Sequence, residues 1–509
     1  MKQLWASNVR WIGPAIVLFV AAALRIWNLG NPHSLVFDET FYVKDAWTLW
    51  NNGYESTWPV GADDKFKEGI TTEFGTDPSY VVHPPLGKWL IGLGMAAFGA
   101  GNSFGWRIGV ALAGILIVLL VMLISQKLFQ STLLTVVAGS LMAIDGHAIT
   151  LSRVSLLDNF VTLFTLAGFG LVLLDRQQNL PRLMAWMRRR RAQIGDEAEG
   201  PTWGPTLWNR PYLILAGLAF GLACSVKWSG LYFIAAFGIY VVVMDALDRR
   251  RVGLPFWASA AVLKQAPATF LLMVPIAFVT YVTSWAGWIL TSGGYYRNLV
   301  TAESGLRWTG PLAWVPDWAQ SLWAYHVSAY QFHVGLVTPH SYQANPLTWL
   351  IMWRPTSMFY EGVNNGEAGC TFDSCASAIT AIANPLIWLG GTAAIVYLAY
   401  RLVRYREWKV GFILMGIVAG YVPWLMYLNR TVFQFYGIVY EPYMILAITF
   451  VVSVILGIKD DYKRNTGIAI LTVFGILTVL LSIFFYPLWS GMQIPYWYWH
   501  IHMWMPSWI

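Results

Sequence analysis

The sequence predicts an all-α polytopic membrane protein, and three observations lead to that prediction. The 509-residue chain is 57% hydrophobic, contains 29 Trp, and is only 12% charged. Soluble proteins carry roughly 25% charged residues, so this chain has too few charges to cover soluble or disordered domains with a water-exposed surface. Its apolar residues form continuous runs, which excludes a transmembrane β-barrel, and three cysteines are too few for a disulfide scaffold.

The membrane spans follow from the apolar runs and the basic residues between them. Eleven runs are long enough, or nearly so, to cross a hydrocarbon core of about 30 Å. They lie at 11–28, 107–125, 131–149, 156–174, 211–227, 230–247, 268–290, 384–402, 409–428, 436–457 and 466–487. A shorter run at 86–100 is interrupted by glycines. If it crossed the membrane, the basic segment 188–191 and every later basic loop would lie outside, so we expect 86–100 to lie flat on the outer surface.

This topology places the N-terminus in the cytoplasm and the C-terminus outside the cell (plasma) membrane. Most of the 33 Lys and Arg residues then fall in short cytoplasmic segments, so the net charge of +7 reflects topology and does not indicate nucleic-acid binding. The predicted organisation is an N-terminal transmembrane catalytic module (1–290) with the first extracytoplasmic loop (29–106), a large extracytoplasmic loop (291–383), a C-terminal four-helix transmembrane module (384–487) and a Trp-rich extracytoplasmic tail (488–509).

Two adjacent carboxylates, Asp38 and Glu39, follow the first span in the sequence FDETFY. Most of the later acidic residues of this loop are expected to form a solvated acidic face; they are Asp45, Glu55, Asp63, Asp64, Glu68, Glu73 and Asp77. Asp38 and Glu39 differ because aromatic residues flank them at the membrane surface, where desolvation raises a carboxyl pKa and suits it to proton transfer. Capping a helix that begins near Thr40 is an alternative role, and it is compatible with catalysis.

Three basic residues lie at outer ends of spans, where the positive-inside rule disfavours them: Arg107, Arg153 and Lys227. Snorkelling to lipid phosphates would explain any one of them, but three on the side that carries the two carboxylates indicate an anionic partner. Asp158, near an outer span end, is expected to pair with Arg153 or orient it. The combination fits a lipid-linked sugar phosphate, since cations stabilise a leaving phosphate and a carboxylate can deprotonate an acceptor hydroxyl.

The second outer loop contains His326, His333 and His340, of which the first two would share one helix face. No carboxylate accompanies them at a ligand spacing, so acceptor binding or packing is favoured over a metal site. No cofactor is expected, although the sequence does not decide whether a divalent ion is needed. Arg430 and Tyr436, in the last outer turn, are candidate donor contacts.

The three cysteines have separate interpretations. Cys224 lies in an apolar run and is expected to be a small packing residue. Cys370 and Cys375 lie close together in a polar loop, so one local disulfide could form in an oxidising compartment. The sequence leaves open whether it does.

Several motifs occur in a fixed order along nearly the whole chain: FDETFY, HPPLGKWL, the Arg of GWRIGV, SRVSLLDNF, SVKWSGLY, TPHSYQANPLTW and RTVFQFYGIVYEPY. They resemble the protein O-mannosyltransferases, and most of all the short bacterial, actinobacterial-type branch. The resemblance implies a GT-C glycosyltransferase fold with about eleven transmembrane helices and surface-lying helices in the first outer loop. It also implies a polyprenyl-phosphate-mannose donor, Ser/Thr acceptors on exported proteins and inversion at the sugar.

The resemblance also implies residue roles. Asp38 would be the catalytic base, Glu39 a carboxylate that organises the acceptor or the site, and Arg107 and Lys227 ligands of the donor phosphate. Arg153 and Arg430 are further phosphate-binding candidates by position. Supporting or acceptor-side roles are assigned to Tyr42, His83, Asp158, His333 and His340. One departure is that 291–383 is too short to hold the β-trefoil insert of the eukaryotic members.

Two alternatives stay open. The same carboxylates and cations would serve a GT-C enzyme that acts on a cell-envelope glycan or lipid. A lipid or solute transporter would need discontinuous helices and charges near the middle of the membrane, whereas these charges lie at outer span ends. The expected partners are therefore the membrane, a lipid-linked sugar donor, Ser/Thr-containing exported polypeptides and the Sec translocon, with no nucleic acid.

Overall fold

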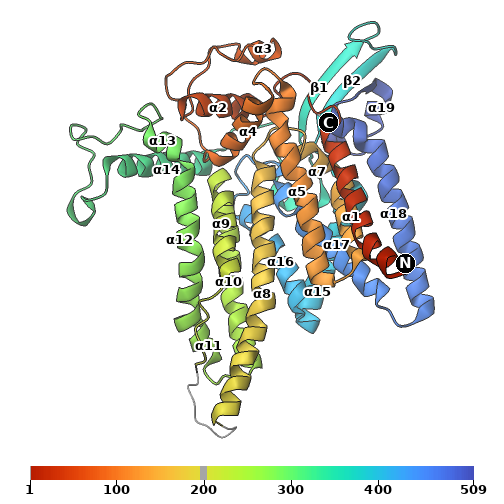
Figure 1. Cartoon of the computed structure of the whole chain (residues 1–509). Coiled ribbons are helices and arrows are strands. Elements are labelled where there is room, and N and C mark those ends of the chain that lie inside the picture. The colour runs from red at the N-terminus through yellow and green to blue at the C-terminus, as the bar shows by residue number, and fades with distance from the viewer. Residues whose placement is uncertain (1, 195–202) are drawn as a thin grey trace.

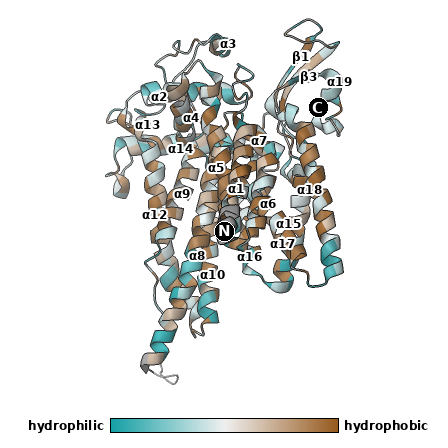
Figure 2. Cartoon of the chain, turned by 45° about the vertical axis from the view of Figure 1, so that its right-hand side comes forward, coloured by the Kyte–Doolittle hydropathy of each residue, from teal (hydrophilic) through white to brown (hydrophobic). Residues whose placement is uncertain are grey.

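The computed structural model describes residues 2–194 and 203–509 and is predominantly helical. Long helices run side by side in a bundle, and short helices, loops and a small sheet gather at its upper end in Figure 1. We call this the loop-rich end; the C-terminus lies there. Hydrophobic residues dominate the middle of the bundle, and hydrophilic residues gather towards both ends (Figure 2). The bundle therefore has the hydropathy pattern of a protein that crosses a membrane.

Each predicted apolar run contains one main helix. These helices are α1 (Lys2–Ile26), α5 (Ser103–Phe129), α6 (Thr132–Ile144), α8 (Asp158–Ile194), α9 (Pro211–Val226), α10 (Gly230–Arg251), α12 (Ala266–Ser284), α15 (Pro385–Tyr405), α16 (Trp408–Tyr421), α17 (Glu441–Leu456) and α18 (Asp461–Ser490). Within the two described stretches, seven helices are long and apolar enough to cross a membrane, and further apolar helices are shorter. A multi-span membrane protein is therefore confirmed, and the count of eleven spans stays a prediction.

Several predicted boundaries were wrong, including the run 268–290, which is divided between α12 and α13 (Ala286–Leu290), and the run 409–428, in which α16 ends at Tyr421. The run 131–149 is not one helix, because α6 ends at Ile144 and a separate helix, α7 (Gly146–Leu151), begins after Asp145. The Asp145 carboxylate accepts hydrogen bonds from the backbone N–H groups of His147 and Ala148, which caps the new helix. The predicted loop 175–210 is largely helical, because α8 continues to Ile194; residues 195–202 lie outside the described part.

The first outer loop contains α2 (Glu39–Asn52), α3 (Ala62–Lys67) and α4 (Leu86–Phe98), all at the loop-rich end (Figure 1). Helix α4 packs between α2 and α5 so closely that it needs glycine. A Cβ on Gly94 would lie 2.6 Å from the carbonyl oxygen of Gly105, and a Cβ on Gly92 would lie 3.0 Å from that of Ala46. The glycines that interrupt the run 86–100 thus allow α4 to hold α2, which begins at the two carboxylates, against α5, which carries Arg107.

A small sheet corrects the prediction of an all-α protein. Strands β1 (Ser357–Asn364), β2 (Ser374–Thr380) and β3 (Gln493–Pro495) form an antiparallel sheet in the order β1-β2-β3. Because β3 comes from the C-terminal tail, the sheet joins that tail to the second outer loop. Such long-range pairing leaves little trace in a pattern of apolar runs.

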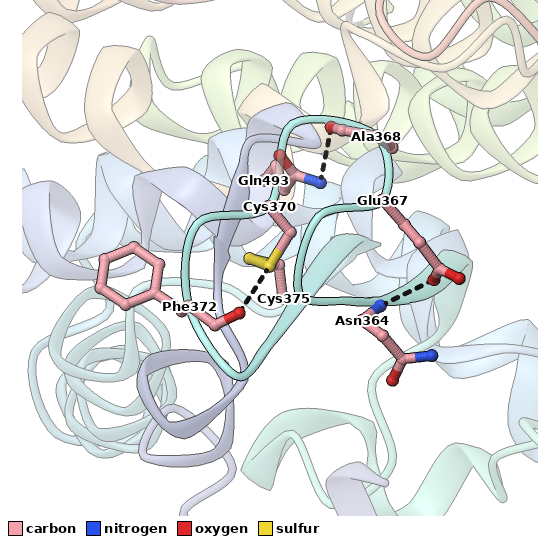
Figure 3. The surroundings of a disulfide bond; sticks show 7 residues. All are labelled: Asn364, Glu367, Ala368, Cys370, Phe372, Cys375 and Gln493. Carbon is pink, nitrogen blue, oxygen red and sulfur yellow. Dashed lines mark hydrogen bonds between the residues drawn. A yellow bond between two sulfur atoms is a disulfide. The ribbon is translucent and has the colours of Figure 1, made fainter.

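The loop between β1 and β2 is closed by a disulfide between Cys370 and Cys375 (Figure 3). Gln493 of the tail strand donates a hydrogen bond from its side chain to the carbonyl of Ala368 in this loop. Cys224 is buried and unbonded, as its apolar surroundings predicted.

The remaining elements surround the site described below. Helix α14 (Asp317–Gly335) lies across the loop-rich end beside α13 (Ala286–Leu290), and α11 (Trp257–Ala260) precedes α12 through a short π-helical segment (Figure 1). Helix α19 (Tyr496–His500) lies in the C-terminal tail. The main core is one continuous cluster of buried apolar residues that includes residues of both the N-terminal and the C-terminal helices.

Candidate active site

A cavity of about 230 Å³ is lined by five of the eleven candidate site residues that the sequence indicated: His83, Asp158, Lys227, His333 and Arg430. It is lined by His83, Asp158, Lys227, Trp228, Ser229, Leu231, Tyr232, Phe233, Tyr330, His333, Val334, Ala419, Gly420, Trp424, Tyr427, Arg430, Tyr436 and Val439. Its walls are therefore the start of α8, the α9–α10 junction, α14, α16 and the segment before α17. The cavity takes residues from three predicted segments, 1–290, 291–383 and 384–487, so the site is not confined to the first of them.

Lys227 and Asp158 form an ion pair in the cavity wall. Lys227 follows the last residue of α9 in an extended conformation, and Asp158 is the first residue of α8. The Lys227 ammonium donates a hydrogen bond from Nζ to Oδ2 of Asp158 at 2.7 Å and lies 5.1 Å from the ring centroid of Tyr436. An ammonium has three donors, so this pairing leaves donors for an anion. The expectation that Asp158 would pair with Arg153 was wrong.

Arg430 is held in the cavity by His333. The Arg430 guanidinium donates from Nη2 to Nδ1 of His333 at 3.0 Å, and the His333 Nε2 lies 2.9 Å from the carbonyl oxygen of Val82. Because arginine only donates, Nδ1 must accept, and Nε2 carries the proton given to Val82. Burial lowers the pKa of the His333 imidazole to about 4, consistent with this neutral form. The Arg430 Nε is buried without a partner among the described residues, whereas Nη1 makes no hydrogen bond to them and is not buried, so Nη1 can donate to a ligand.

His83 and Tyr42 extend this wall towards α2. The His83 ring centroid lies 5.1 Å from that of His333 and 6.1 Å from that of Tyr42. Burial lowers the pKa of the His83 imidazole well below its usual value, assisted by the positive charge of Lys227, so His83 is neutral. Burial likewise raises the pKa of the Tyr42 hydroxyl, and the Asp38 charge adds to that shift. Both side chains can therefore offer neutral hydrogen-bonding groups to a sugar or peptide.

Asp38 occupies the N-cap position of α2 but makes no side-chain capping hydrogen bond. The half-buried Asp38 carboxyl therefore does not cap α2, so the alternative role of a helix cap is wrong. Burial raises the pKa of the Asp38 carboxyl to about 6, with the Lys227 charge lowering it and the Asp158 charge raising it. Asp38 is not one of the lining residues, but its neighbour Phe37 packs edge-on against Phe433 and Phe435, which lie just before the cavity residue Tyr436. A carboxyl with this pKa can act as a base near neutral pH.

Glu39 and Arg107 are fully buried and form an ion pair with each other. The Arg107 guanidinium donates to both carboxylate oxygens of Glu39 at 2.8 Å, and its other donors reach the backbone carbonyls of Leu29, Pro32 and Ser34. Glu39 also accepts from the backbone N–H groups of Val36 (3.0 Å) and Ser155 (2.7 Å). All five Arg107 donors are engaged, so this arrangement supports a positioning role and not the expected phosphate contact.

Arg153 also has a structural role. Its guanidinium donates to the carbonyls of Leu24, Arg25, Trp27 and Asn28 at the end of α1, and to that of Ser490 at the end of α18. The last carbonyls of a helix have no partner within the helix, and a cation placed there satisfies them. The structure therefore places Arg153 outside the cavity and joins the ends of two helices through it.

The other two outer-loop histidines lie apart from the cavity lining. His326 shares α14 with His333, as predicted, but its Nε2 lies 2.5 Å from the Tyr281 hydroxyl. His340 is exposed, accepts from the backbone N–H of Tyr342, and packs edge-on against Phe37 beside Asp38. In the portion of the chain the structure describes, no group of three or more His, Cys, Asp or Glu side chains could hold a metal ion.

Part of the predicted acidic face is buried instead. Glu55 is 5% exposed and pairs with Lys88, which is 1% exposed and donates a further hydrogen bond to the carbonyl of His83. Burial raises the pKa of the nearby Asp45 carboxyl to about 7, opposed by the Lys88 charge. Lys88 is a charged residue within the apolar run 86–100, and this sequence signal could have revealed the buried ion pair with Glu55. The aromatic lining of the cavity had no such signal, because aromatics occur throughout both outer loops.

The helical bundle and the site at its loop-rich end define the class as a GT-C-type membrane glycosyltransferase fold. The structure resembles that of the Saccharomyces cerevisiae protein O-mannosyltransferase complex bound to the sugar donor, with a TM-score of 0.70 at 13% identity, covering 98% of this chain and 92% of that one. The archaeal oligosaccharyltransferase of Archaeoglobus fulgidus, in complex with an inhibitory peptide and a dolichol-phosphate, gives a TM-score of 0.51 at 16% identity, covering 96% of this chain and 57% of that one.

Sequence comparison narrows the class to one family. The dolichyl-phosphate-mannose-protein mannosyltransferase model matches residues 15–188, and the model of the C-terminal four-transmembrane region of protein-O-mannosyltransferase matches 318–508. A polyprenol-phosphate-mannose–protein mannosyltransferase of Mycolicibacterium smegmatis is 32% identical (98% of this chain, 93% of that protein), and those of Mycobacterium tuberculosis (98% and 92%) and Corynebacterium glutamicum (97% and 92%) are 31% and 30% identical. The chain belongs to the protein O-mannosyltransferase family, as its motifs indicated.

Proposed function

We propose that the protein transfers mannose from polyprenyl-phosphate mannose to Ser or Thr hydroxyls of exported proteins, with inversion, on the extracytoplasmic face of the plasma membrane. The observation that supports this most directly is the pairing of one carboxyl of raised pKa, Asp38, with a cavity that holds two cations, Lys227 and Arg430. A base and a phosphate site are the two parts that this reaction needs. The full-length similarity to curated mannosyltransferases supports the choice of donor and acceptor.

The geometry supports a single displacement. Asp38 takes the proton of the acceptor hydroxyl while the hydroxyl oxygen forms a bond to C1 of the mannose. The bond between C1 and the phosphate oxygen breaks, and the polyprenyl phosphate leaves with the bonding electrons. Lys227 and Arg430 stabilise the negative charge that grows on the leaving phosphate. Attack from the face opposite the phosphate inverts the configuration at C1.

The buried ion pair of Glu39 and Arg107 contributes to this reaction by positioning Asp38. Glu39 is the residue after Asp38, and Arg107 ties it to the three carbonyls of residues 29–34. We assign Arg107 and Glu39 to holding the start of α2, and thereby the Asp38 backbone, in place. A base must lie within hydrogen-bond reach of its proton, so a small displacement of this turn would slow transfer.

The outer location of the site has independent support from the disulfide. Disulfides persist in oxidising compartments and are rare in the cytosol, and the Cys370–Cys375 bond lies in the second outer loop of the predicted topology. Exported polypeptides would therefore meet the site after crossing the membrane. Delivery by the Sec translocon stays a prediction that no contact of the described residues tests.

The test is mannosyl transfer by purified protein in lipid vesicles. Polyprenyl-phosphate mannose and a Ser/Thr peptide are supplied, and mass spectrometry measures the gain of one hexose. Asp38→Asn should lower the rate by roughly 10²–10⁴-fold, the usual contribution of a general base. Asp64→Asn is a matched control because Asp64 lies in the same loop with a side chain that is 79% exposed. Full activity of Asp38→Asn, or a wild type that glycosylates only an envelope glycan or lipid, would contradict the proposal.

A further inference from the structure

Helix α14 carries an exposed apolar stripe along one side. Trp323, Val327, Tyr330 and Val334 follow one another at steps of four, three and four residues, so they lie on one side of the helix. All four side chains are exposed, those of Trp323 and Tyr330 by 61% and 59%. We call these four residues the α14 stripe. Large exposed apolar patches mark surfaces that contact a protein, a ligand or a membrane.

The opposite side of α14 packs against the protein. Leu322 and Tyr325 belong to a buried apolar cluster with Trp285 and Trp288, at the junction of α12 and α13. The Tyr325 hydroxyl also donates to the carbonyl of Val81 (2.7 Å) and accepts from its backbone N–H (3.2 Å) in the first outer loop. At about 100° per residue, Tyr325 lies nearly opposite the stripe. The α14 stripe is therefore turned away from the first outer loop.

Contacts with α12 fix the level of α14 in the bundle. On α14, the Nε2 of His326 lies 2.5 Å from the hydroxyl of Tyr281 on α12. Phe278 and Val279, two and three residues before Tyr281, are exposed on the side of α12 that would face lipid. They lie only about 3–5 Å further down the helix axis, and Figure 1 shows α14 lying across this upper end of α12. A helix that lies in a membrane surface buries its apolar face by about 5–10 Å, so this level is suitable for contact with lipid.

The surroundings of the stripe favour lipid as its occupant. Tyr330 and Val334 also line the active-site cavity, whose other walls include the ends of α8, α9, α10 and α16, so the stripe faces the side of the spans. The loop before α14 adds three exposed apolar side chains, Leu306, Leu312 and Trp314, the last of them 77% exposed. Trp and Tyr are enriched where a membrane meets water, because each combines an apolar ring with a polar group.

We propose that α14 lies in the plane of the membrane surface at the loop-rich end, with the α14 stripe inserted among the lipids of that leaflet. This lipid contact is separate from the transfer reaction and requires neither donor nor acceptor. It also has a consequence for the site: α14 carries His333, which holds Arg430, so the inserted stripe keeps this wall of the cavity at the level of the lipid headgroups.

The test measures the surroundings of a spin label on the stripe. The native thiols do not interfere, because Cys224 is buried and the other two cysteines are bonded to each other. A nitroxide is attached to Val327→Cys or, in a second variant, to Trp323→Cys, in the full chain in vesicles of phosphatidylcholine and phosphatidylglycerol. Electron paramagnetic resonance then measures collisions of the label with oxygen, which concentrates in the bilayer, and with a polar nickel chelate present on both sides.

Val60→Cys is the matched control, because Val60 is a fully exposed valine before α3 in the first outer loop. Collisions with the chelate should be on the order of tenfold rarer at Val327 than at Val60, because apolar lipid excludes polar solutes. Collisions with oxygen should be as frequent as at Phe278→Cys on the lipid-facing side of α12.

Two outcomes would overturn the proposal. If the chelate reached both stripe labels as often as it reaches Val60, the stripe would face water; protection that then appeared on adding a Ser/Thr peptide would assign it to the acceptor polypeptide. If the labels were shielded from oxygen as well as from the chelate, protein and not lipid would cover the stripe, and a second copy of this chain would be its partner.

Discussion

Arg107 donates two parallel hydrogen bonds to Glu39, from Nε to Oε1 and from Nη2 to Oε2, each 2.8 Å long, and both side chains are fully buried. Removing one partner of such a pair leaves an uncompensated buried charge, which costs about 3–5 kcal/mol. Arg107→Lys keeps the charge but loses the planar fork that serves Glu39 and three carbonyls. We therefore expect Arg107→Lys to lower the unfolding temperature in detergent and to lower kcat, with the donor KM unchanged.

The comparison that separates this role from phosphate binding is Arg430→Lys. Arg430 lines the cavity, so its substitution should raise the donor KM and leave the unfolding temperature nearly unchanged. If Arg107→Lys instead raised the donor KM at constant stability, Arg107 would be a phosphate ligand and the positioning role would be wrong.

Arg153 and Lys227 provide a second contrast. Both were predicted to bind phosphate, but Arg153 donates only to backbone carbonyls of the two helix ends, and Lys227 faces the cavity. Arg153→Met should destabilise the protein by about 1–3 kcal/mol, the cost of leaving buried acceptors unpaired, with an unchanged donor KM. Lys227→Met should raise the donor KM about 10- to 100-fold, in line with hydrogen bonds to charged groups. It should also lower the unfolding temperature, because it leaves the buried Asp158 carboxylate without its partner. Thermal unfolding and donor titration would measure both effects, and a raised donor KM in Arg153→Met or an unchanged one in Lys227→Met would contradict the assignment.

These contrasts show which part of the site could be predicted from sequence. The positive-inside rule identified Arg107, Arg153 and Lys227 as unusual without structural information. It could not tell which of them would be satisfied by the protein itself, because the acceptors lie far away in the chain: Arg153 reaches both residue 27 and residue 490. A guanidinium buried against carbonyls and one that faces a ligand look the same in a hydropathy profile.

The fold, too, could be predicted from the sequence only in part. Apolar runs predicted where the long helices lie, since an apolar stretch must become helical in lipid to satisfy its backbone. They missed the break at Asp145, where a carboxylate caps a new helix within a run, and the sheet, whose strand β3 comes from the distant tail. Both features depend on single polar contacts or long-range pairing, which local composition does not record.

The three cysteines should differ in reactivity. Cys370 and Cys375 form a disulfide and Cys224 is a buried thiol. Native protein isolated without reductant should therefore take up no maleimide, denatured protein one equivalent, and denatured, reduced protein three, as read by mass spectrometry. Reduction should also make the loop between β1 and β2 easier to cleave, because closing a loop this short contributes about 2 kcal/mol. Labelling of all three cysteines without reductant would contradict both the bond and the outer location of the loop.

Asp38 should reduce the stability of the folded protein near neutral pH. Its folded pKa of about 6 lies above the ordinary value of 3.8, so folding favours the protonated form and ionisation destabilises the native state. The destabilisation is absent below about pH 4, grows as pH rises between the two pKa values, and is complete above pH 6. Asp38→Asn should thus be more stable than wild type at pH 7.5 by on the order of 1–3 kcal/mol. Its advantage should vanish at pH 4; an equal advantage at both would show that the pKa is not raised.

The same carboxyl should set the acid limit of catalysis. Because the base must be ionised, kcat/KM for the acceptor should rise with pH and reach half its plateau near pH 6. The Lys227 charge lowers the Asp38 pKa and the Asp158 charge raises it. The acid limb of the kcat/KM–pH profile should therefore move to higher pH in Lys227→Met and to lower pH in Asp158→Asn. Asp64→Asn, which changes a charge on the exposed acidic side of the loop, should leave it in place. Opposite shifts in the first two variants identify Asp38 as the titrating group, and a limb that moves in neither variant would assign the proton transfer to another residue.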